Sequence, residues 1–266
     1  MTDSIADQSI VAERTAFFNW LRDQQADKTL SQDNVDAGHQ ALLKISTAEL
    51  PDLLIRMGLA KSSILLIPTP NPPKTTRQDI IDAANRINVE PAAIKALNDV
   101  ESPKGGFYAD GTPVILFERH KYYQALTARH WYTKRDEMVG KYPDVCNSSS
   151  GAYNVRPQYE KLEIAATLNW DAAHEAASWG FGQVMGFNWQ KLGYDSLRDF
   201  VTKMYESEGQ QLDAVCRYIK VTGLDKALQR KDWAAFAKGY NGKDYRRNEY
   251  DKKIASAYSR AKREGW

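Results

Sequence analysis

The sequence predicts an α+β fold that is predominantly helical and contains one small β-hairpin. From residue 77 onward, apolar side chains recur at three- and four-residue spacing through most of the chain, which is typical of helices with one buried face. Residues 106–117 differ, because an Asp-Gly turn signal at 110 and 111 precedes an apolar run at 114–117. A chain of 266 residues is long enough for these elements to bury a substantial core.

Prolines at 68, 70, 72 and 73 predict a stiff, extended linker over residues 67–76. This linker divides the chain into a small helical N-terminal segment, residues 1–66, and a main domain, residues 77–266. In the N-terminal segment the apolar residues have helical spacing, and Ser31 is suited to cap the middle helix. The sequence contains no internal repeat, so repeat architectures are excluded.

The main domain begins with a helix over residues 80–87, and Pro91 opens the next helix. Apolar residues at 94, 97 and 100 share one face of this second helix. The Ser-Pro pair at 102 and 103, followed by glycines at 105 and 106, predicts that the helix ends at Glu101.

Helices are also predicted after the hairpin, with two interruptions that could border a binding site. Residues 120–129 continue as a helix, whereas residues 142–157 are rich in Ser, Gly, Asn and Pro and predict a long loop. Residues 178–186 contain glycines that let backbone and rings approach closely, which suits a groove wall or a tight packing turn. The chain from 196 onward is helical, with a break at 239–245 that places a tyrosine and an asparagine at a helix end.

The charge balance gives no reason to expect nucleic-acid binding. The formal net charge is +2, and although residues 241–266 hold 8 Lys and Arg against 4 Asp and Glu, a solvated helix face explains that excess as well as an anionic surface does. The first 20 residues are polar and acidic, and the apolar run at 64–67 is too short to span a membrane. We therefore expect synthesis into the cytoplasm and no stable membrane insertion.

The two cysteines and four histidines do not indicate a metal or disulfide site. Cys146 and Cys216 form no recognisable spacing pattern, and Cys216 lies at a core position of a predicted helix. His174 and Glu175 begin like a zinc-protease helix, but Ser178 stands where the second histidine is required. No nucleophile elbow, phosphate loop or dinucleotide fingerprint is present. We expect neither a metal nor a cofactor.

Two carboxylates lie at the ends of predicted secondary-structure elements. Glu101 ends a helix, where the negative end of the helix dipole and burial beside Phe107 or Tyr108 would both raise its pKa and favour a neutral acid. Glu118 ends the hairpin. A neutral acid facing a second carboxylate is the arrangement that glycosidic bond cleavage requires, because one group protonates the leaving oxygen and the other handles water or positive charge.

A structural explanation exists for both residues. Glu101 would then be a solvated helix-end side chain, and Glu118 would pair with Arg119 or Lys121. His120, two residues after Glu118 on an alternating strand, would share its face and tune it or serve only as a hydrogen-bonded structural histidine.

Taken together, several motifs resemble the N-acetylmuramidase domain of bacteriophage endolysins. They are, in order, Val-Glu101-Ser, Gly106-Phe107, Ile-Leu-Phe-Glu118-Arg-His120, Ser178-Trp-Gly-Phe-Gly-Gln183-Val-Met-Gly186, Tyr240-Asn-Gly242 and Tyr250-Asp251. The resemblance covers residues 77–266. The chain is more remotely similar to goose-type lysozymes and soluble lytic transglycosylases, which implies a lysozyme-like fold.

The resemblance implies hydrolysis of the β-1,4 bond between N-acetylmuramic acid and N-acetylglucosamine in peptidoglycan. It assigns Glu101 as the catalytic acid and Glu118 as a second active-site carboxylate. The glycan strand would bind to Phe107, His120, Ser178, Trp179, Phe181, Gln183, Tyr240 and Asn241. The repeats of a wall-binding module, which many relatives carry, are not found in residues 1–66.

Two alternatives to this activity stay open. A lytic transglycosylase needs one acid/base glutamate and forms a 1,6-anhydro ring without water, and a non-catalytic wall-binding or virion structural protein needs neither carboxylate. If the chain is an endolysin, we expect a monomer that accumulates in the host cytoplasm, passes the membrane with the help of a holin, and acts on peptidoglycan in the periplasm.

Overall fold

The computed structural model describes residues 68–103 and 105–266, together with residues 18, 21, 22, 31–33, 35, 37 and 38. The other residues of the predicted N-terminal helical segment lie outside the described residues. The chain divides into two compact units, one formed by Met1–Ile67 with Ala166–Trp170 and one formed by Pro68–Ala165 with Asp171–Trp266. The second unit contains the candidate site.

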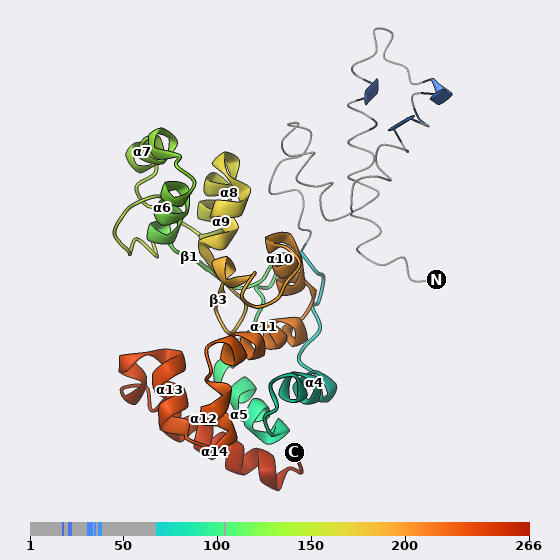
Figure 1. The fold of residues 1–266 in the computed structure, drawn as a ribbon, viewed down its shortest axis with the longest axis vertical. Coiled ribbons are helices and arrows are strands. Elements are labelled where there is room, and N and C mark those ends of the chain that lie inside the picture. The colour runs from blue at the N-terminus through green and yellow to red at the C-terminus, as the bar shows by residue number, and fades with distance from the viewer. Residues whose placement is uncertain are drawn as a thin grey trace. The chain divides into compact units, whose positions relative to one another are not determined.

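The second unit is mainly helical, as Figure 1 shows. Its α-helices, two of which cross the boundary between the units, are α4 (Arg77–Ile87), α5 (Pro91–Glu101), α6 (Arg119–Ala128), α7 (Tyr132–Lys141), α8 (Gln158–Leu168), α9 (Trp170–Glu175), α10 (Leu197–Glu206), α11 (Glu208–Val221), α12 (Asp225–Gln229), α13 (Trp233–Asn241) and α14 (Tyr250–Arg263). Short 3-10 helices are η2 (Gly186–Asn188) and η3 (Lys243–Arg246), and the strands are β1 (Ile115–Phe117), β2 (Ala177–Trp179) and β3 (Val184–Met185). The predominantly helical α+β fold predicted from the sequence is confirmed.

Helix α5 lies in the middle of a helical group. It packs against α14 and α4, and α4 packs against α11 (Figure 1). The α4 helix begins with a capping box between Thr76 and Asp79, and Pro91 opens α5, where a missing N–H costs nothing. Ala92 and Ala96 are fully buried on α5, and such small side chains let neighbouring helices approach closely. The end of α5 is thereby held in a fixed place.

The strands form one antiparallel sheet in the order β1-β2-β3. Ile115 of β1 pairs with Trp179 of β2, and Trp179 pairs in turn with Val184 of β3. The predicted hairpin is present before β1 as a narrow turn, because the Tyr108 N–H donates to the Thr112 carbonyl at 2.8 Å. In the sheet, however, β1 pairs with β2, which lies some 60 residues further along the chain.

The segment over residues 68–76 is extended, and it is bonded to the second unit. The Thr69 hydroxyl donates to the Tyr205 carbonyl at 2.5 Å. The Glu208 N–H donates to the Pro73 carbonyl at 3.0 Å, and the Lys74 ammonium lies 2.8 Å from the Glu208 carboxylate. This segment therefore packs on α10 and α11.

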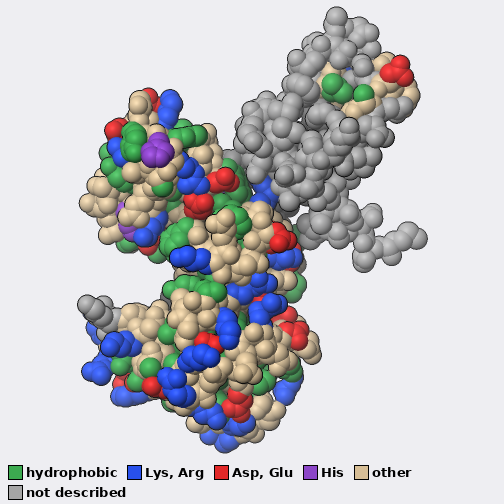
Figure 2. Space-filling view, viewed as in Figure 1, with side chains coloured by type: hydrophobic (Ala, Val, Ile, Leu, Met, Phe, Trp, Pro, Cys, Tyr) green, Lys and Arg blue, Asp and Glu red, His purple; other side chains and the backbone are tan. Residues whose placement is uncertain are grey.

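Basic residues on α14 have acidic partners. Arg260 lies 3.5 Å from Asp99, Lys252 lies 2.7 Å from Glu249, and Lys262 pairs with Glu90. Figure 2 shows positive and negative side chains interspersed over this group of helices. Within the described ranges, every helix is too short or too polar to traverse a lipid bilayer.

Both cysteines are reduced and buried. Cys216 is 0% exposed on α11, as its helical spacing predicted. Burial raises the pKa of the Cys146 thiol to about 12, and burial raises the pKa of Cys216 as well.

Candidate active site

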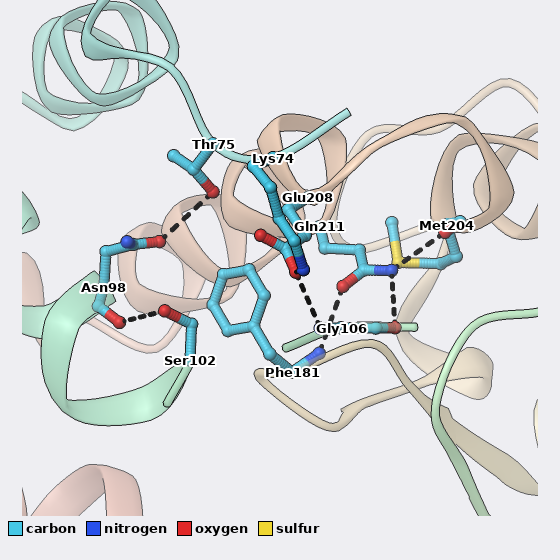
Figure 3. A network of polar contacts seen from close by, with 9 residues as sticks. All are labelled: Lys74, Thr75, Asn98, Ser102, Gly106, Phe181, Met204, Glu208 and Gln211. Carbon is cyan, nitrogen blue, oxygen red and sulfur yellow. Dashed lines mark hydrogen bonds and ion pairs between the residues drawn. The ribbon is translucent and has the colours of Figure 1, made fainter. Parts of the chain in front are cut away.

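Glu101 is the last residue of α5, as predicted. Ser102 ends the helix, because its N–H and its hydroxyl both donate to the Asn98 carbonyl, at 2.9 and 2.6 Å. The Thr75 hydroxyl donates to the Asn98 side chain at 3.4 Å and so ties this helix end to the extended segment (Figure 3). The turn that presents the Glu101 carboxyl is thus fixed by local hydrogen bonds.

The Glu101 side chain lines a cleft of about 380 Å³. Besides the end of α5, the lining comes from the β2–β3 turn, η2, α11 and α13. The lining residues are Glu101, Phe181, Gly182, Gln183, Val184, Met185, Phe187, Asn188, Tyr218, Tyr240 and Asn241. Of the residues predicted to bind glycan, Phe181, Gln183, Tyr240 and Asn241 therefore lie together with Glu101.

The Glu101 carboxyl is suited to hold a proton. Burial raises its pKa, and the nearby Asn241 side chain opposes that change only in part. The Oε1 atom of Glu101 is buried and has no hydrogen-bond partner among the described residues, and the same holds for Asn241 Oδ1. A buried carboxyl oxygen without a partner favours the neutral form, because an ion there would lack compensation.

Tyr240 links the two sides of the cleft. Its hydroxyl donates to the Gly182 carbonyl in the β2–β3 turn at 3.3 Å. Its ring stacks on Phe236 at 5.4 Å and meets Tyr218 edge-on at 6.2 Å. Burial raises the pKa of the Tyr240 hydroxyl, and the neighbouring Glu101 adds to that effect.

The β2–β3 turn places Gln183 in the cleft with a strained backbone. Its φ is 49°, a left-handed conformation that few residues other than glycine adopt. The side chain compensates locally, since its amide donates to the Gly180 carbonyl at 2.7 Å and its oxygen accepts from the Ser178 hydroxyl at 2.7 Å. Ser178 is itself buried, so it positions Gln183 instead of lining the cleft.

The glycines of this turn allow close packing, as the sequence predicted. A Cβ on Gly182 would lie 2.0 Å from a Val215 methyl group, and one on Gly180 would lie 2.6 Å from the Gln211 side chain. The turn therefore rests directly on α11.

Gln211 connects that turn to the loop after α5. It is 1% exposed, and its oxygen accepts from the Phe181 N–H at 3.1 Å. Its amide group donates to the Gly106 carbonyl at 3.1 Å and the Met204 carbonyl at 3.0 Å (Figure 3). One buried side chain thus ties the β2–β3 turn, which lines the cleft, to the loop after α5.

Glu208, one helical turn earlier, holds the same loop. Its Oε1 atom accepts from the Gly106 N–H at 2.9 Å and from Lys74 at 2.8 Å (Figure 3). A buried carboxylate is tolerated here because both contacts supply hydrogen-bond donors.

Glu118 lies at the junction of β1 and α6. Its N–H donates to the Ala176 carbonyl at 3.0 Å, which extends the β1–β2 ladder, and its own carbonyl accepts from the Tyr122 N–H at 3.1 Å to begin α6. Glu118 is the N-cap residue, but its side chain makes no capping bond. The Tyr153 hydroxyl donates to Glu118 Oε2 at 3.1 Å, and His120 Nδ1 lies 3.2 Å from the same oxygen.

This environment suits a negative charge on Glu118. The positive end of the α6 dipole and the Tyr153 donor both favour an anion at this position. Burial and the Glu118 carboxylate together raise the pKa of Tyr153, so its hydroxyl keeps its proton. Glu101 therefore lies at the C-terminal, negative end of the α5 dipole, whereas Glu118 lies at the N-terminal, positive end of the α6 dipole.

The predicted long loop, residues 142–157, supplies Tyr153. Arg119 donates to the carbonyls of residues 143, 149 and 150, at 2.9–3.0 Å. Lys161 donates to the carbonyls of 152 and 153, at 2.5 and 3.2 Å. Gln158 donates to the Tyr153 carbonyl at 2.6 Å and accepts from the Phe117 N–H at 2.8 Å. Because Arg119 is engaged with this loop, it is not the partner of Glu118, although the structural explanation named it as one of two candidates with Lys121.

Other predicted site residues lie elsewhere. Trp179 is 1% exposed, stacks on His174 at 5.6 Å and donates to its carbonyl at 3.2 Å, so it belongs to the core and does not line the cleft. Phe107 is half-buried in the hairpin, where it bridges to Pro113. The prediction that His120 shares a strand face with Glu118 is wrong, because His120 is on α6 and meets Glu118 through the helix turn.

Two aromatic residues of the cleft were not predicted from the sequence, and a third, Tyr250, was part of a motif without an assigned role. Tyr218 and Phe187 line the cleft. Tyr250, at the start of α14, lies near enough to Glu101 that the carboxyl helps raise the pKa of its hydroxyl. Phe187 directly follows Gly186, so its position at the end of the glycine-rich stretch was the sequence feature that could have identified it as a cleft residue.

A second depression lies elsewhere on the described surface. It measures about 520 Å³ and lies between α5 and α14, lined by Asp99, Val100, Pro103, Glu249, Lys252, Lys253, Ser256, Ala257 and Arg260. Most of its charged groups are already paired, and Glu101 is absent from it.

In the described part of the chain, no group of three His, Cys, Asp or Glu side chains is placed to hold a metal ion. The Glu101 cleft is therefore the candidate active site.

Comparison with known proteins identifies the family of this chain. The chain matches the family model for N-acetylmuramidase over residues 90–262, more than half of its length. The structure is similar to the crystal structure of the Burkholderia AP3 phage endolysin, with a TM-score of 0.67 and 40% sequence identity over 74% of each chain. A comparison with curated proteins finds no match. This chain belongs to the N-acetylmuramidase family, whose members are glycoside hydrolases that cleave bacterial peptidoglycan.

Proposed function

We propose that the chain is a phage endolysin in which Glu101 is the general acid and Glu118 the second catalytic carboxylate. The observation that carries the proposal is the buried Glu101 carboxyl, which faces the cleft at the end of α5 with its Oε1 atom unpartnered. A carboxyl in this state can donate its proton to the glycosidic oxygen as the bond to N-acetylmuramic acid breaks.

Glu118 stabilises the positive charge that develops on the sugar, or it positions the water that attacks the sugar. Its place at the positive end of α6 and its hydrogen bond from Tyr153 support an ionised state during the reaction. The two carboxylates then have opposite protonation states, which is what general acid catalysis of glycoside cleavage requires.

The glycan strand lies along the cleft. Tyr240 and Phe181 contribute to its apolar lining, and Asn241 offers an amide beside the Glu101 carboxyl. Gln183 and Ser178 have their polar groups bonded to each other, so they shape the wall more than they bind substrate.

The test compares isosteric variants on purified peptidoglycan. Glu101→Gln removes the proton donor and should lower kcat by about 10²–10⁴-fold. Glu118→Gln should cause a large but incomplete loss. Glu137→Gln, at a side chain that is 58% exposed on α7, is the control and should keep wild-type activity. Wild-type rates for Glu101→Gln in a correctly folded variant would overturn the assignment.

Product analysis separates hydrolysis from its rival. Hydrolysis leaves a reducing N-acetylmuramic acid end, whereas a lytic transglycosylase leaves a 1,6-anhydro end lighter by one water. Mass spectrometry of the released fragments should show reducing ends. Sedimentation of the protein with cell walls without any fall in turbidity would instead point to a non-catalytic wall-binding protein.

The remaining parts of the proposal concern the cell. We propose that the enzyme is a monomer, that it collects in the host cytoplasm, and that a holin gives it passage to the wall. Expression with and without a holin gene tests this, because lysis should require both proteins. Lysis by the enzyme alone, with the protein recovered from the periplasm, would contradict the holin requirement.

A further inference from the structure

An exposed aromatic ring and a lysine meet at the rim of the cleft. Phe187, in η2, lines the cleft and is 46% exposed, which is unusual for a phenylalanine. The Lys121 ammonium lies over its ring, 5.5 Å from the centroid. The two residues come from elements that are distant in the sequence, so only the fold brings them together.

The backbone holds Phe187 in this position. A Cβ on the preceding Gly186 would lie 2.1 Å from the His174 carbonyl oxygen, so η2 packs directly against the end of α9. The backbone therefore cannot move inward at this point, and the Phe187 side chain is exposed beside it. An exposed ring face next to a sugar-binding cleft is suited to stack on a pyranose.

Lys121 connects this ring with the second carboxylate. It lies in the first turn of α6, and its N–H donates to the Glu118 carbonyl at 2.8 Å. Among the residues that the structure describes, the Lys121 ammonium has no carboxylate partner, and its one polar contact is a 3.4 Å hydrogen bond to Gln124. A half-buried cation without a counter-ion attracts an anionic group of a ligand.

We infer that Lys121 and Phe187 form a subsite for an N-acetylmuramic acid unit, with the sugar on the Phe187 ring and a carboxylate of that unit paired with Lys121. The inference rests on the proposed function, because it assumes that the glycan lies in the Glu101 cleft. N-acetylglucosamine carries no carboxylate, so this subsite distinguishes the two sugars of the strand and sets the register in which the strand binds.

The carboxylate has two possible sources. In peptidoglycan that carries stem peptides, the lactyl group of N-acetylmuramic acid is an amide and the free carboxylates belong to the peptide. In glycan freed of its stems by an amidase, the lactyl carboxylate itself is exposed. Activation of the carboxylates with a carbodiimide in the presence of methylamine converts them to neutral methylamides in either substrate.

The experiment measures kcat/KM of wild-type enzyme and Lys121→Gln on four substrates: peptidoglycan with stems, stem-free glycan, and the methylamidated form of each. Amidation should slow the wild type about fivefold, in keeping with a partly exposed ion pair, and should leave Lys121→Gln unaffected. The substrate in which the effect occurs identifies the source. Lys134→Gln, whose side chain is 59% exposed on α7, is the control and should respond to amidation as the wild type does.

Phe187→Ala tests the stacking half of the subsite. It should raise KM about tenfold on every substrate, and Phe187→Trp should restore it, because a larger ring keeps the sugar contact. Tyr132→Ala, at a ring that is 47% exposed on α7, should change nothing. The inference is overturned if Lys121→Gln keeps the wild-type sensitivity to amidation or if Phe187→Ala keeps the wild-type KM. Either result leaves the roles of Glu101 and Glu118 standing, since those depend on their own variants.

Discussion

The Tyr153 hydroxyl donates a hydrogen bond to Glu118 Oε2 at 3.1 Å across 35 residues of chain. This contact explains why the loop over residues 142–157 is bonded so extensively to α6 and α8. Lys161 and Gln158 both bind the Tyr153 carbonyl, and the loop thereby fixes one oxygen of the second carboxylate.

Tyr153→Phe should lower kcat about tenfold while KM stays near the wild-type value. The reason is that a hydrogen bond to a charged group contributes about 1.5–3 kcal/mol, and here it orients a catalytic group instead of the substrate. Steady-state kinetics on solubilised glycan strands provide the measurement. Tyr108→Phe, at a residue that is 42% exposed, is the matched control. An unchanged kcat for Tyr153→Phe would show that Glu118 does not need this donor.

Asn241→Asp should move the alkaline limb of the pH–activity profile to higher pH. Glu101 must be protonated to act, so activity falls as pH rises through its pKa. Asn241 now lowers that pKa, whereas a carboxylate at the same place would raise it, which keeps the acid protonated to higher pH. The profile of kcat/KM against pH measures the shift. A limb that stays in place or moves to lower pH would mean that another group controls it.

Gly106→Ala should destabilise the protein by about 2–4 kcal/mol and reduce activity, because a Cβ would lie 1.8 Å from Gln211 Oε1 and would break the bonds by which this side chain joins the β2–β3 turn to the loop after α5. Gly140→Ala is the control: it lies in α7, and apart from the adjoining helix backbone no heavy atom lies within 4 Å of a Cβ there. That change should stabilise the protein by about 0.5–1 kcal/mol. Urea denaturation compares the two, and equal stabilities would refute the role given to Gln211.

Trp179→Ala should cost about 3–5 kcal/mol of unfolding free energy, because the side chain is fully buried and contacts the rings of His174 and Tyr205. Phe187→Ala should cost little, since nearly half of that residue is exposed. Thermal or chemical denaturation of both variants checks the contrast. If Trp179→Ala instead folded with normal stability and lost only glycan affinity, the core position of Trp179 would be refuted.

Sequence patterns predicted the local features of the site well. The end of α5 at Glu101 follows from a serine, a proline and glycines that cannot continue a helix, and these signals act within a few residues. The close packing of Gly180 and Gly182 was likewise evident from composition. Such features depend on short-range sterics and hydrogen bonds, which the sequence specifies directly.

Long-range features were not predictable in the same way. Strand β2 is buried on both faces, so its alternation could not reveal that Trp179 faces the core and not the cleft. His120 reaches Glu118 because α6 begins at residue 119, one position earlier than its apolar spacing suggested. The contacts of Tyr153 with Glu118 and of Lys121 with Phe187 join elements whose distance is set by tertiary packing alone.

The burial of both cysteines makes the protein convenient for site-specific chemistry. The raised pKa values of Cys146 and Cys216 leave almost no thiolate at neutral pH, so neither should react with maleimide while the fold is intact. Val155→Cys, at a position that is 70% exposed in the loop that carries Tyr153, would then be the one reactive thiol. A fluorophore attached there would report, in real time, the docking of a wall fragment beside Glu118.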